Sequence, residues 1–268
     1  MSKLIVSGCS YTDNWYTSRF GFTTWPELLA EKLGMECINL GSCGSGNEYI
    51  LSSLMDMMFK KEIGLMIAMW SELQRIDFEI TISRQDSYKP DLAQPFLPIG
   101  KKFTRIQRMV ATSVLPAIHR WTHVNMRQNA DSAPWRDEAK EIFQKENVGT
   151  LPAMICKGIR AFYTFQTMME VHNIPYLQIQ GCSPCHYQDE YIFMKQFFLN
   201  QYFLKMNENT FVGWPILSAL GGTHIDQVLD DIDPDRKKLR ISEEDTHPNK
   251  EGHEAICDFL LERVKCRN

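Results

Sequence analysis

Short runs of apolar residues, each ended abruptly by small or polar residues, constrain the fold of this chain more than any other feature. Four such runs lie at residues 4–8, 36–40, 65–70 and 174–180. The run at 65–70 (LMIAMW) is apolar at successive positions and does not alternate with polar residues. Continuous runs of this length are typical of parallel strands that are covered on both faces.

Helix-like patterns separate these runs. They lie at residues 24–33, 49–61, 153–172, 191–206 and 249–264. In the first pattern Pro26 falls in the first turn and Gly34 just past the end, where these residues favour the start and stop of a helix. Together with a short edge element at 211–217, the alternation predicts an α/β fold of three layers around a parallel sheet.

Residues 80–150 interrupt this regular alternation. The stretch is rich in proline and more polar, and it has one helix-like piece near residues 104–127. A chain of 268 residues can form one large core. We therefore expect a single domain over residues 1–268, with an insertion or cap at about 80–150.

Charge and apolar content exclude several classes of function. Lys and Arg number 29 and Asp and Glu 33, a net charge of −4, whereas proteins that grip nucleic acid usually have a basic surplus. The apolar run at 63–70 is far shorter than the roughly 20 residues that cross a bilayer. The first residues lack the apolar segment of a signal peptide. We expect a cytoplasmic protein without nucleic-acid or membrane partners, whose 8 cysteines are reduced.

Small and polar residues follow each predicted strand at its carboxyl end. Ser10 follows the first strand, residues 41–47 (GSCGSGN) follow the second, Ser71 follows the third and Cys182 the fourth. Functional sites in parallel α/β folds gather at the carboxyl ends of the strands. These residues are therefore expected to lie near one another.

A carboxylate and a histidine stand near the other end of the chain, in EEDTHPNKEGH at residues 243–253. A serine hydroxyl is a poor nucleophile at neutral pH. It needs a base within hydrogen-bond reach, and the base needs an orienting carboxylate. Ser10, His247 and Asp245 supply these three groups. Backbone N–H groups in the glycine-rich loop at 41–47 are suited to stabilising an oxyanion.

Four blocks of the sequence resemble the SGNH (GDSL-type) hydrolases, in that family's order. GCSYTD at 8–13 stands where the family has Gly-Asp-Ser. NLGSCGSGN at 39–47 stands where it places an oxyanion-hole glycine, here Gly44. MWSEL at 69–73 stands where the family usually has Gly-x-Asn-Asp, and DTHPNKEGH at 245–253 resembles its Asp-x-x-His-Pro block. The variant with Gly-Cys-Ser and Trp-Ser is similar to SGNH-type proteins encoded by bacteriophages.

The resemblance implies a flavodoxin-like parallel sheet of about five strands and ester hydrolysis that needs neither a cofactor nor a metal. It implies a catalytic triad of Ser10, His247 and Asp245, with an oxyanion hole formed by Ser10, Gly44 and Ser71. The expected substrate is an acetyl or short acyl ester, with a carbohydrate as one candidate alcohol. The sequence leaves open a homo-oligomer, a place in a phage assembly and an association with the virion.

The sequence departs from the family pattern at three places. Cys9 replaces the usual aspartate, and Ser71 stands where an asparagine side chain would donate to the oxyanion. Asp245 precedes the histidine by two residues, whereas the family spacing of three selects Glu244. We prefer Asp245 because the shorter spacing also fits this branch. Since losing one oxyanion donor typically costs about 10²–10³ in rate, the alternative is an inactive protein that serves as a binding module or phage-particle component.

The individual residues also have simpler interpretations. Ser10 could be an ordinary turn serine, and Cys9 could replace it as the nucleophile, although neighbouring side chains are expected to point apart. His247 could merely start a helix. Asn47 is expected to be the N-cap of the helix that follows it.

Two further patterns suggest metals or redox chemistry. The run Cys182-x-x-Cys185-His186 has the spacing of a haem c attachment site and of redox or metal-binding thiols. We interpret it as a loop at the rim of the site. His119 and His123 could share a helix face and bind a metal, although no third ligand is clear.

Overall fold

The computed structural model describes residues 1–82, 118–126 and 134–266. The chain divides into two compact units, residues 1–76 with 123–268 and residues 77–122. The residues of the candidate triad (Ser10, Asp245 and His247) and of the candidate oxyanion hole (Ser10, Gly44 and Ser71) all belong to the first unit.

A five-stranded sheet forms the centre of the larger unit. Its strands are β1 (Lys3–Ser7), β2 (Glu36–Asn39), β3 (Ile63–Trp70), β6 (Tyr176–Gln180) and β7 (Phe211–Val212), in the order β2-β1-β3-β6-β7. Every neighbouring pair is parallel. When the five strands of this sheet are numbered 1 to 5 along the chain, their spatial order is 2-1-3-4-5, which is the order of flavodoxin-like folds. The predicted α/β fold around a parallel sheet is therefore confirmed.

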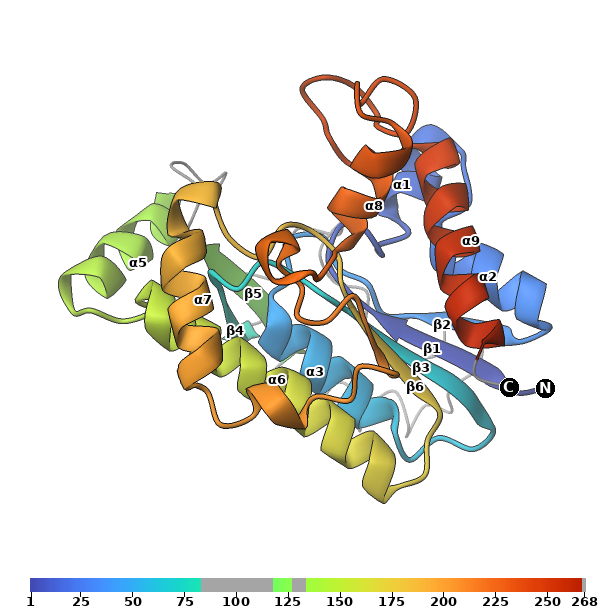
Figure 1. Ribbon diagram of the computed structural model, residues 1–268, viewed down its shortest axis with the longest axis horizontal. Helices are drawn as coiled ribbons and strands as arrows, with labels where there is room; N and C mark the ends of the chain where they lie inside the picture. The colour runs from blue at the N-terminus through green and yellow to red at the C-terminus, as the bar shows by residue number, and fades with distance from the viewer. Residues whose placement is uncertain (83–117, 127–133, 267–268) are drawn as a thin grey trace, which may run out of the picture. The chain divides into compact units, whose positions relative to one another are not determined.

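Helices cover both faces of this sheet (Figure 1). On one face α2 (Trp25–Leu33) packs against α9 (Lys250–Lys265), and on the other α3 (Asn47–Met57) packs against α6 (Leu151–Val171). The other described α-helices are α1 (Trp15–Phe20), α5 (Pro134–Lys145), α7 (Glu190–Leu199) and α8 (Ile225–Ile232). Short 3₁₀ turns lie at Tyr187–Asp189, Phe203–Lys205 and Ser218–Leu220.

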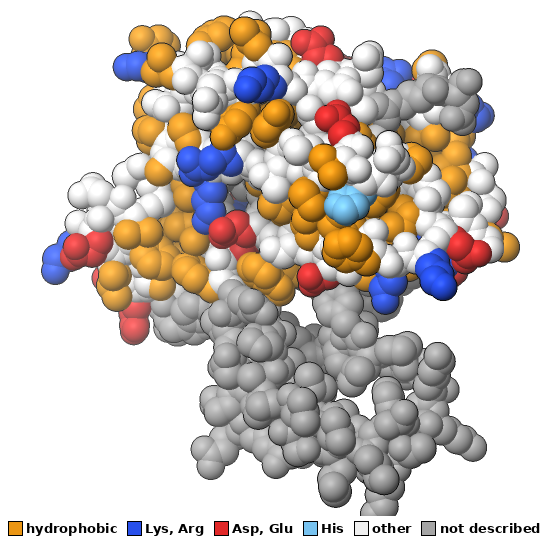
Figure 2. Space-filling view, turned by 90° about the horizontal axis from the view of Figure 1, so that it is seen from below, with side chains coloured by type: hydrophobic (Ala, Val, Ile, Leu, Met, Phe, Trp, Pro, Cys, Tyr) orange, Lys and Arg blue, Asp and Glu red, His pale blue; other side chains and the backbone are white. Residues whose placement is uncertain are grey.

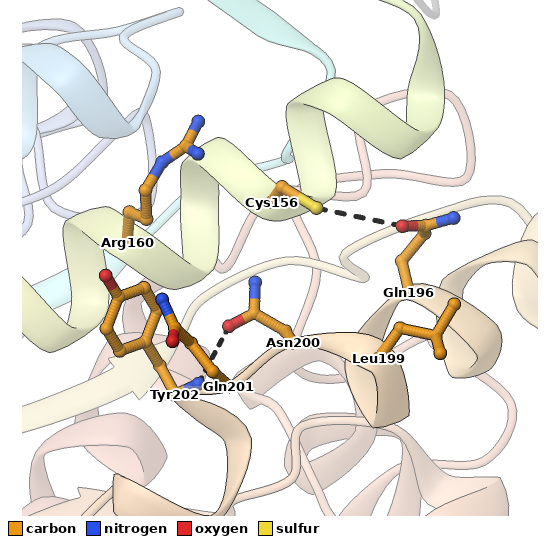
Figure 3. A pocket seen from close by; sticks show the side chains of 7 residues that line it. All are labelled: Cys156, Arg160, Gln196, Leu199, Asn200, Gln201 and Tyr202. Carbon is orange, nitrogen blue, oxygen red and sulfur yellow. Dashed lines mark hydrogen bonds between the residues drawn. The ribbon is translucent and has the colours of Figure 1, made fainter.

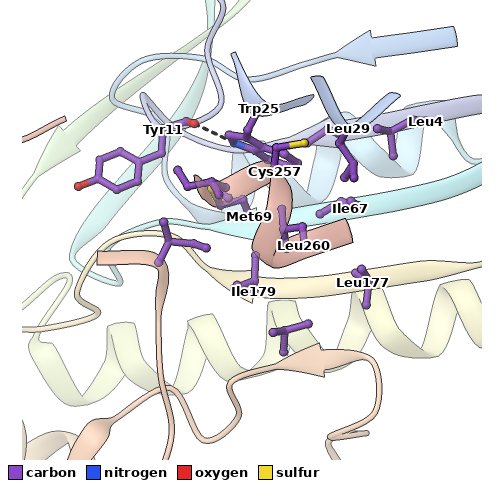
Figure 4. Packing of buried hydrophobic residues seen from close by; sticks show 14 of the residues in the cluster. Leu4, Tyr11, Trp25, Leu29, Ile67, Met69, Leu177, Ile179, Cys257 and Leu260 are labelled. Carbon is purple, nitrogen blue, oxygen red and sulfur yellow. Dashed lines mark hydrogen bonds between the residues drawn. The ribbon is translucent and has the colours of Figure 1, made fainter. Parts of the chain in front are cut away.

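Burial on both faces explains the continuous apolar run in β3. Alternate residues, including Ile67 and Met69, lie in a cluster shared with α2 and α9. Figure 4 shows this cluster, which also contains Leu4, Leu29, Leu177, Ile179 and Leu260. On the opposite face the Trp70 ring lies 4.8 Å from that of Phe162 and 5.9 Å from that of Phe165, between centroids. Each fully buried side chain of this size contributes about 1.5–3 kcal/mol.

The ends of α2 and α9 follow from their sequences. Gly34 ends α2 in the left-handed region (φ 65°), which glycine adopts without steric cost. Asn249 caps α9, since its side-chain oxygen accepts the N–H of Gly252 at 3.0 Å. Its amide nitrogen donates to the carbonyls of Lys238 (2.9 Å) and Arg240 (3.0 Å). These bonds attach the start of α9 to the segment before it.

A separate two-stranded sheet corrects one prediction. β4 (Arg75–Ile82) pairs with β5 (Ile118–Asn125). The helix-like piece expected near 104–127 is wrong for residues 118–125, which form β5, while 104–117 lie outside the described residues. β4 reads RIDFEITI, whose apolar residues alternate as in a half-buried strand. Of the cap expected at 80–150, residues 83–117 and 127–133 are also outside the described residues.

Smaller differences concern helices. The helix expected at 191–206 stops at Leu199, and a 3₁₀ turn follows. The sequence analysis did not predict α1 or α8. The N-cap of α8 is His224, whose Nδ1 accepts the N–H of Gln227 at 3.2 Å. Histidine is not among the common N-cap residues, so this start is hard to recognise.

Hydrophobic side chains are also exposed, and Figure 2 shows one face on which they lie among charged side chains. The described examples in α7 and the turn after it are Tyr191, Ile192, Phe198, Leu199 and Leu204. Exposed apolar residues are common on protein surfaces. In the described part of the chain, no helix combines the length and the apolar character that a membrane span requires.

His253 in α9 is a fully buried titratable group. Its Nδ1 accepts the backbone N–H of Trp25 at 3.3 Å. Burial lowers the pKa of His253 from 6.5 to about 3, so the folded protein keeps the imidazole neutral where the unfolded chain protonates it. The unfolded state then binds more protons, and stability must fall as the pH drops from about 6.5 toward 3.

We expect this loss to be absent from a His253→Gln variant, because glutamine retains an acceptor but does not titrate. In urea unfolding between pH 7 and pH 4, the free energy of unfolding of the wild-type protein should fall, relative to that of the variant, by up to about 1.4 kcal/mol for each pH unit. Using the difference between the two proteins removes the contribution of the other titrating groups. Parallel pH curves for the two proteins would contradict the prediction.

Candidate active site

Ser10 lies in the turn that follows β1 and is 4% exposed. The N–H groups of Thr12 and Asp13 donate to the carbonyl of Cys9 at 2.9 and 3.0 Å, which closes the turn. Cys9 itself is 1% exposed and belongs to the hydrophobic core cluster. The sulfur of Cys9 is therefore in the interior, while the hydroxyl of Ser10 is at the edge of the sheet.

The structure brings Ser10, His247 and Asp245 together. His247 Nε2 lies 2.8 Å from Ser10 Oγ, although 237 positions separate the two residues. His247 Nδ1 lies 2.6 Å from Asp245 Oδ1. Glu244 is directed elsewhere, since its carboxylate accepts the hydroxyl of Ser242 at 3.0 Å. Of the two candidate acids, Asp245 is the one in contact with the histidine.

A tight turn presents Asp245 and His247. Arg240 and Pro248 form an antiparallel bridge, beside which the N–H of Ile241 donates to the carbonyl of His247 at 2.9 Å. Inside the turn the Asp245 N–H donates to Ser242 Oγ at 2.9 Å. The acid and the base are thus held by a hydrogen-bonded turn immediately before α9.

The loop at residues 41–47 is attached to the Ser10 turn. The N–H of Ser42 donates to the carbonyl of Gly8 at 3.0 Å, and that of Cys43 donates to Asp13 Oδ2 at 2.7 Å. Burial raises the pKa of Asp13. Within this loop Gly44 has φ 81° and packs under the ring of His123. Among the described residues, the backbone N–H groups of Ser10 and Gly44 donate to no backbone carbonyl.

Ser71 follows β3, and its backbone is hydrogen-bonded on both sides, whereas its hydroxyl is not. Its N–H donates to Asn47 Oδ1 at 2.8 Å, and its carbonyl accepts from Gln180 Nε2 at 2.9 Å. Its Oγ is buried and forms no hydrogen bond within geometric limits in the part of the chain that the structure describes, although it lies close enough to the Cys9 thiol to lower the pKa of that thiol. Buried polar groups are rarely left unpaired, and an exception often marks a functional group. The expected role of Asn47 as N-cap is wrong, because Gly46 caps α3.

Arg75 connects two parts of the site, and the sequence analysis did not identify it. Its Nη1 donates to the carbonyl of Ser45 at 3.2 Å, and its Nε donates to Glu72 at 2.9 Å. Asn125 Nδ2 donates to the same carboxylate oxygen at 3.0 Å. Arg75 therefore joins the Gly44 loop to the segment after Ser71. The signal in the sequence was that two charged residues, Glu72 and Arg75, follow a buried strand closely.

The Cys182-x-x-Cys185-His186 run lies in the loop after β6, and both cysteines are free thiols. A hydrogen bond with the Cys182 thiol lowers the pKa of Cys9, and the same bond together with burial raises that of Cys182. Among the described residues, no group of three or more His, Cys, Asp or Glu side chains is arranged to hold a metal. His123 lies on a strand, so it cannot share a helix face with His119.

A surface hollow of about 390 Å³ lies away from these residues (Figure 3). It is lined by Cys156, Arg160, Gln196, Leu199, Asn200, Gln201 and Tyr202. Cys156 donates to Gln196 across it at 3.7 Å. None of the residues in the Ser10 site contributes to this hollow.

The comparisons with known proteins bear on the fold. No protein-family model and no curated protein matches the sequence. Among solved structures, the chain is similar to a protein assigned to the G-D-S-L lipolytic family from Desulfitobacterium hafniense DCB-2 (TM-score 0.50, 12% identity, 98% of this chain and 99% of that one). The chain shares the fold of that protein. It also aligns with an acetyl xylan esterase, an Axe2 variant from Geobacillus stearothermophilus (TM-score 0.47, 11% identity, 98% and 94%).

The close packing at Gly44 yields a prediction about stability. A Cβ at this position would lie 2.2 Å from Cε1 of His123. Gly221 has a similar φ of 80° but nothing within 4 Å of its Cβ position, so Gly221→Ala tests backbone strain alone, about 1–2 kcal/mol. We expect Gly44→Ala to lower the free energy of urea unfolding further, with the excess removed when His123→Ala is added. Equal losses for the two glycine variants would contradict this.

Proposed function

We propose that this chain is an SGNH-type serine hydrolase that cleaves an acetyl or short acyl ester. The observation that carries the proposal is the hydrogen-bonded series of Ser10, His247 and Asp245, with contacts of 2.8 and 2.6 Å. Distances in this range allow a proton to pass directly from the serine hydroxyl to the imidazole. The fold shared with a G-D-S-L family protein supports the same conclusion.

In the proposed reaction Ser10 Oγ attacks the carbonyl carbon, and its proton passes to His247 Nε2. Asp245 accepts the Nδ1–H of His247, which fixes the tautomer and stabilises the imidazolium that forms. When the tetrahedral intermediate collapses, His247 returns the proton to the leaving alcohol. Water then attacks the acyl-enzyme with His247 again as the base, and Ser10 is restored. These residues carry out each step without a cofactor.

The proposed oxyanion hole consists of the backbone N–H groups of Ser10 and Gly44 and the hydroxyl of Ser71. The left-handed conformation of Gly44 and the unpaired, buried Ser71 Oγ support this assignment. Donors in a water-excluded site are worth more than in water, because little solvent competes for the developing charge. A hydroxyl has a shorter reach than the asparagine amide of the family pattern, so Ser71 is the weakest of the three donors.

The first test is labelling with a fluorophosphonate probe, followed by peptide mass mapping. The label should be found on Ser10 and should be absent from Ser10→Ala and His247→Ala. Asp245→Asn should slow labelling by about 10³–10⁴-fold. Glu244→Gln, the matched control, should leave the rate within about threefold, because the Glu244 carboxylate hydrogen-bonds to Ser242 and, among the described residues, not to His247.

A well-folded wild-type protein that takes no label would overturn the proposal. The chain would then fit a binding module or a phage-particle component built on the hydrolase fold, and its partner would be the next target. If Ser10 is labelled, the rates of hydrolysis of p-nitrophenyl acetate, butyrate and octanoate would define the acyl preference. Comparing these rates with the rate on acetylated xylan would define the alcohol preference.

Ser71→Ala tests the weakest donor separately. We expect kcat to fall by about 10-fold or more, with little change in KM. This loss is smaller than, or at the low end of, the loss of about 10²–10³ that removal of a strong oxyanion donor causes. Ser53→Ala is a suitable control for removing a buried hydroxyl, since the hydrogen bonds of Ser53 Oγ within the described residues are with Ser7 Oγ and the carbonyl of Ile50. An unchanged kcat in Ser71→Ala would remove Ser71 from the oxyanion hole.

A further inference from the structure

A buried arginine lies next to the turn that carries Asp245 and His247. The side chain of Arg240 is 2% exposed and forms ion pairs with Asp226 at 3.0 Å and Asp230 at 2.9 Å. A guanidinium removed from water must have its donors satisfied, and these carboxylates do so. The ion pairs alone would be consistent with a purely structural role.

One donor of Arg240 reaches the turn itself. Arg240 Nη1 donates to the carbonyl oxygen of Thr246 at 2.9 Å. Thr246 is the residue between Asp245 and His247, so a shift of its peptide plane would move both side chains. The guanidinium therefore fixes the backbone from which the candidate acid and base project.

Tyr11 connects the same group to the nucleophile. It follows Ser10 directly, and its hydroxyl donates to Asp226 Oδ1 at 2.5 Å while accepting from Arg240 Nη1 at 3.2 Å. The Tyr11 ring meets the His247 ring edge to face, with 5.5 Å between centroids. Burial and the nearby Asp226 raise the pKa of Tyr11 well above 10, which keeps its hydroxyl a donor.

Asp226 attaches the network to the central sheet. Its second carboxylate oxygen accepts the N–H of Ser183 at 3.1 Å, and its backbone N–H donates to the carbonyl of Gly181 at 3.1 Å. Both residues lie in the loop that begins at the carboxyl end of β6. The position of the Arg240 guanidinium is thereby defined relative to the strand ends.

We propose that Arg240, acting with Tyr11 and Asp226, is a positioning residue that holds the His247 ring against Ser10. This inference rests on the serine chemistry proposed above. Within the described part of the chain, the guanidinium of Arg240 donates to Tyr11, Asp226, Asp230 and the Thr246 carbonyl. It acts by fixing the Thr246 carbonyl, while Tyr11 supports the imidazole from the side. Such placement matters because a displacement of about 1 Å between reacting groups can cost about 10²-fold in rate.

The test compares Arg240→Lys and Tyr11→Phe with an Arg236→Met control. Lysine keeps the positive charge, but its single ammonium cannot reproduce the planar fork that spans Asp226, Asp230 and Thr246. Phenylalanine keeps the ring against His247 and removes only the hydroxyl. Arg236 pairs with the same Asp230 from an exposed position, so Arg236→Met removes a neighbouring ion pair without affecting Thr246.

Two readouts are needed, on variants whose thermal melting shows that they are folded. The first is the fluorophosphonate labelling rate of Ser10, which should fall about 10–100-fold in Arg240→Lys and less in Tyr11→Phe, and should stay within about twofold in Arg236→Met. The second is the NMR signal of the His247 Nδ1–H in ¹⁵N-histidine-labelled protein, which should shift or broaden in the first two variants only.

Wild-type rates and an unchanged His247 signal in folded Arg240→Lys and Tyr11→Phe would overturn the proposal. Should Arg240→Lys fail to fold, Tyr11→Phe decides the question by the same two readouts. Wild-type protein that takes no label would overturn the proposed serine chemistry instead. In that case the NMR signal still tests whether Arg240 sets the His247–Asp245 hydrogen bond.

Discussion

The contact between Ser10 and His247 depends on the position of β1 inside the sheet, with a strand on each side. This strand pairs with β2 on one side and with β3 on the other, so the turn after it ends between the loops that follow both neighbours. The packing of α9 on α2 brings the turn at residues 245–247 to the same edge. A strand at the margin of the sheet could not present a side chain to loops on both sides.

Two arginines, the buried Arg240 and the partly buried Arg75, hold the loops around this edge in a similar way. Arg75 donates to the carbonyl of Ser45 in the Gly44 loop, and Arg240 donates to the carbonyl of Thr246 in the histidine turn. Each guanidinium is also paired with a carboxylate, which offsets the cost of removing its charge from water. Backbone carbonyls of loops are seldom satisfied by regular secondary structure, and a guanidinium can join one to a carboxylate some distance away.

The sequence was informative wherever a local pattern determined the structure. Strands and helices around the sheet are visible from apolar periodicity, and the ends of α2 and α9 from Gly34 and Asn249. The residues Ser10, Asp245 and His247 could be selected because chemistry requires those three types, and the resemblance placed them in order. The spacing alone left Glu244 and Asp245 open, and only the hydrogen bonds of the folded turn distinguish them.

Other parts of the site could not be predicted, because they depend on contacts between distant segments. Nothing near Arg240 in the sequence indicates that Tyr11 will lie beside it, since the pair is separated by 229 positions. Asparagine is a residue type that is common at helix N-caps, yet the Asn47 side chain accepts a hydrogen bond from the backbone of Ser71 instead. The strand β5 was misread for a similar reason, because its pairing with β4 and not its own periodicity defines it.

The wide separation of Ser10 and His247 along the chain also has a consequence for biosynthesis. Ser10 is synthesised 237 positions before His247. Contacts between distant segments form late, after the cost of closing the intervening loop has been met. The growing chain therefore holds Ser10 without its histidine until residue 247 has been made, and the Ser10–His247 hydrogen bond forms only when α9 packs against α2.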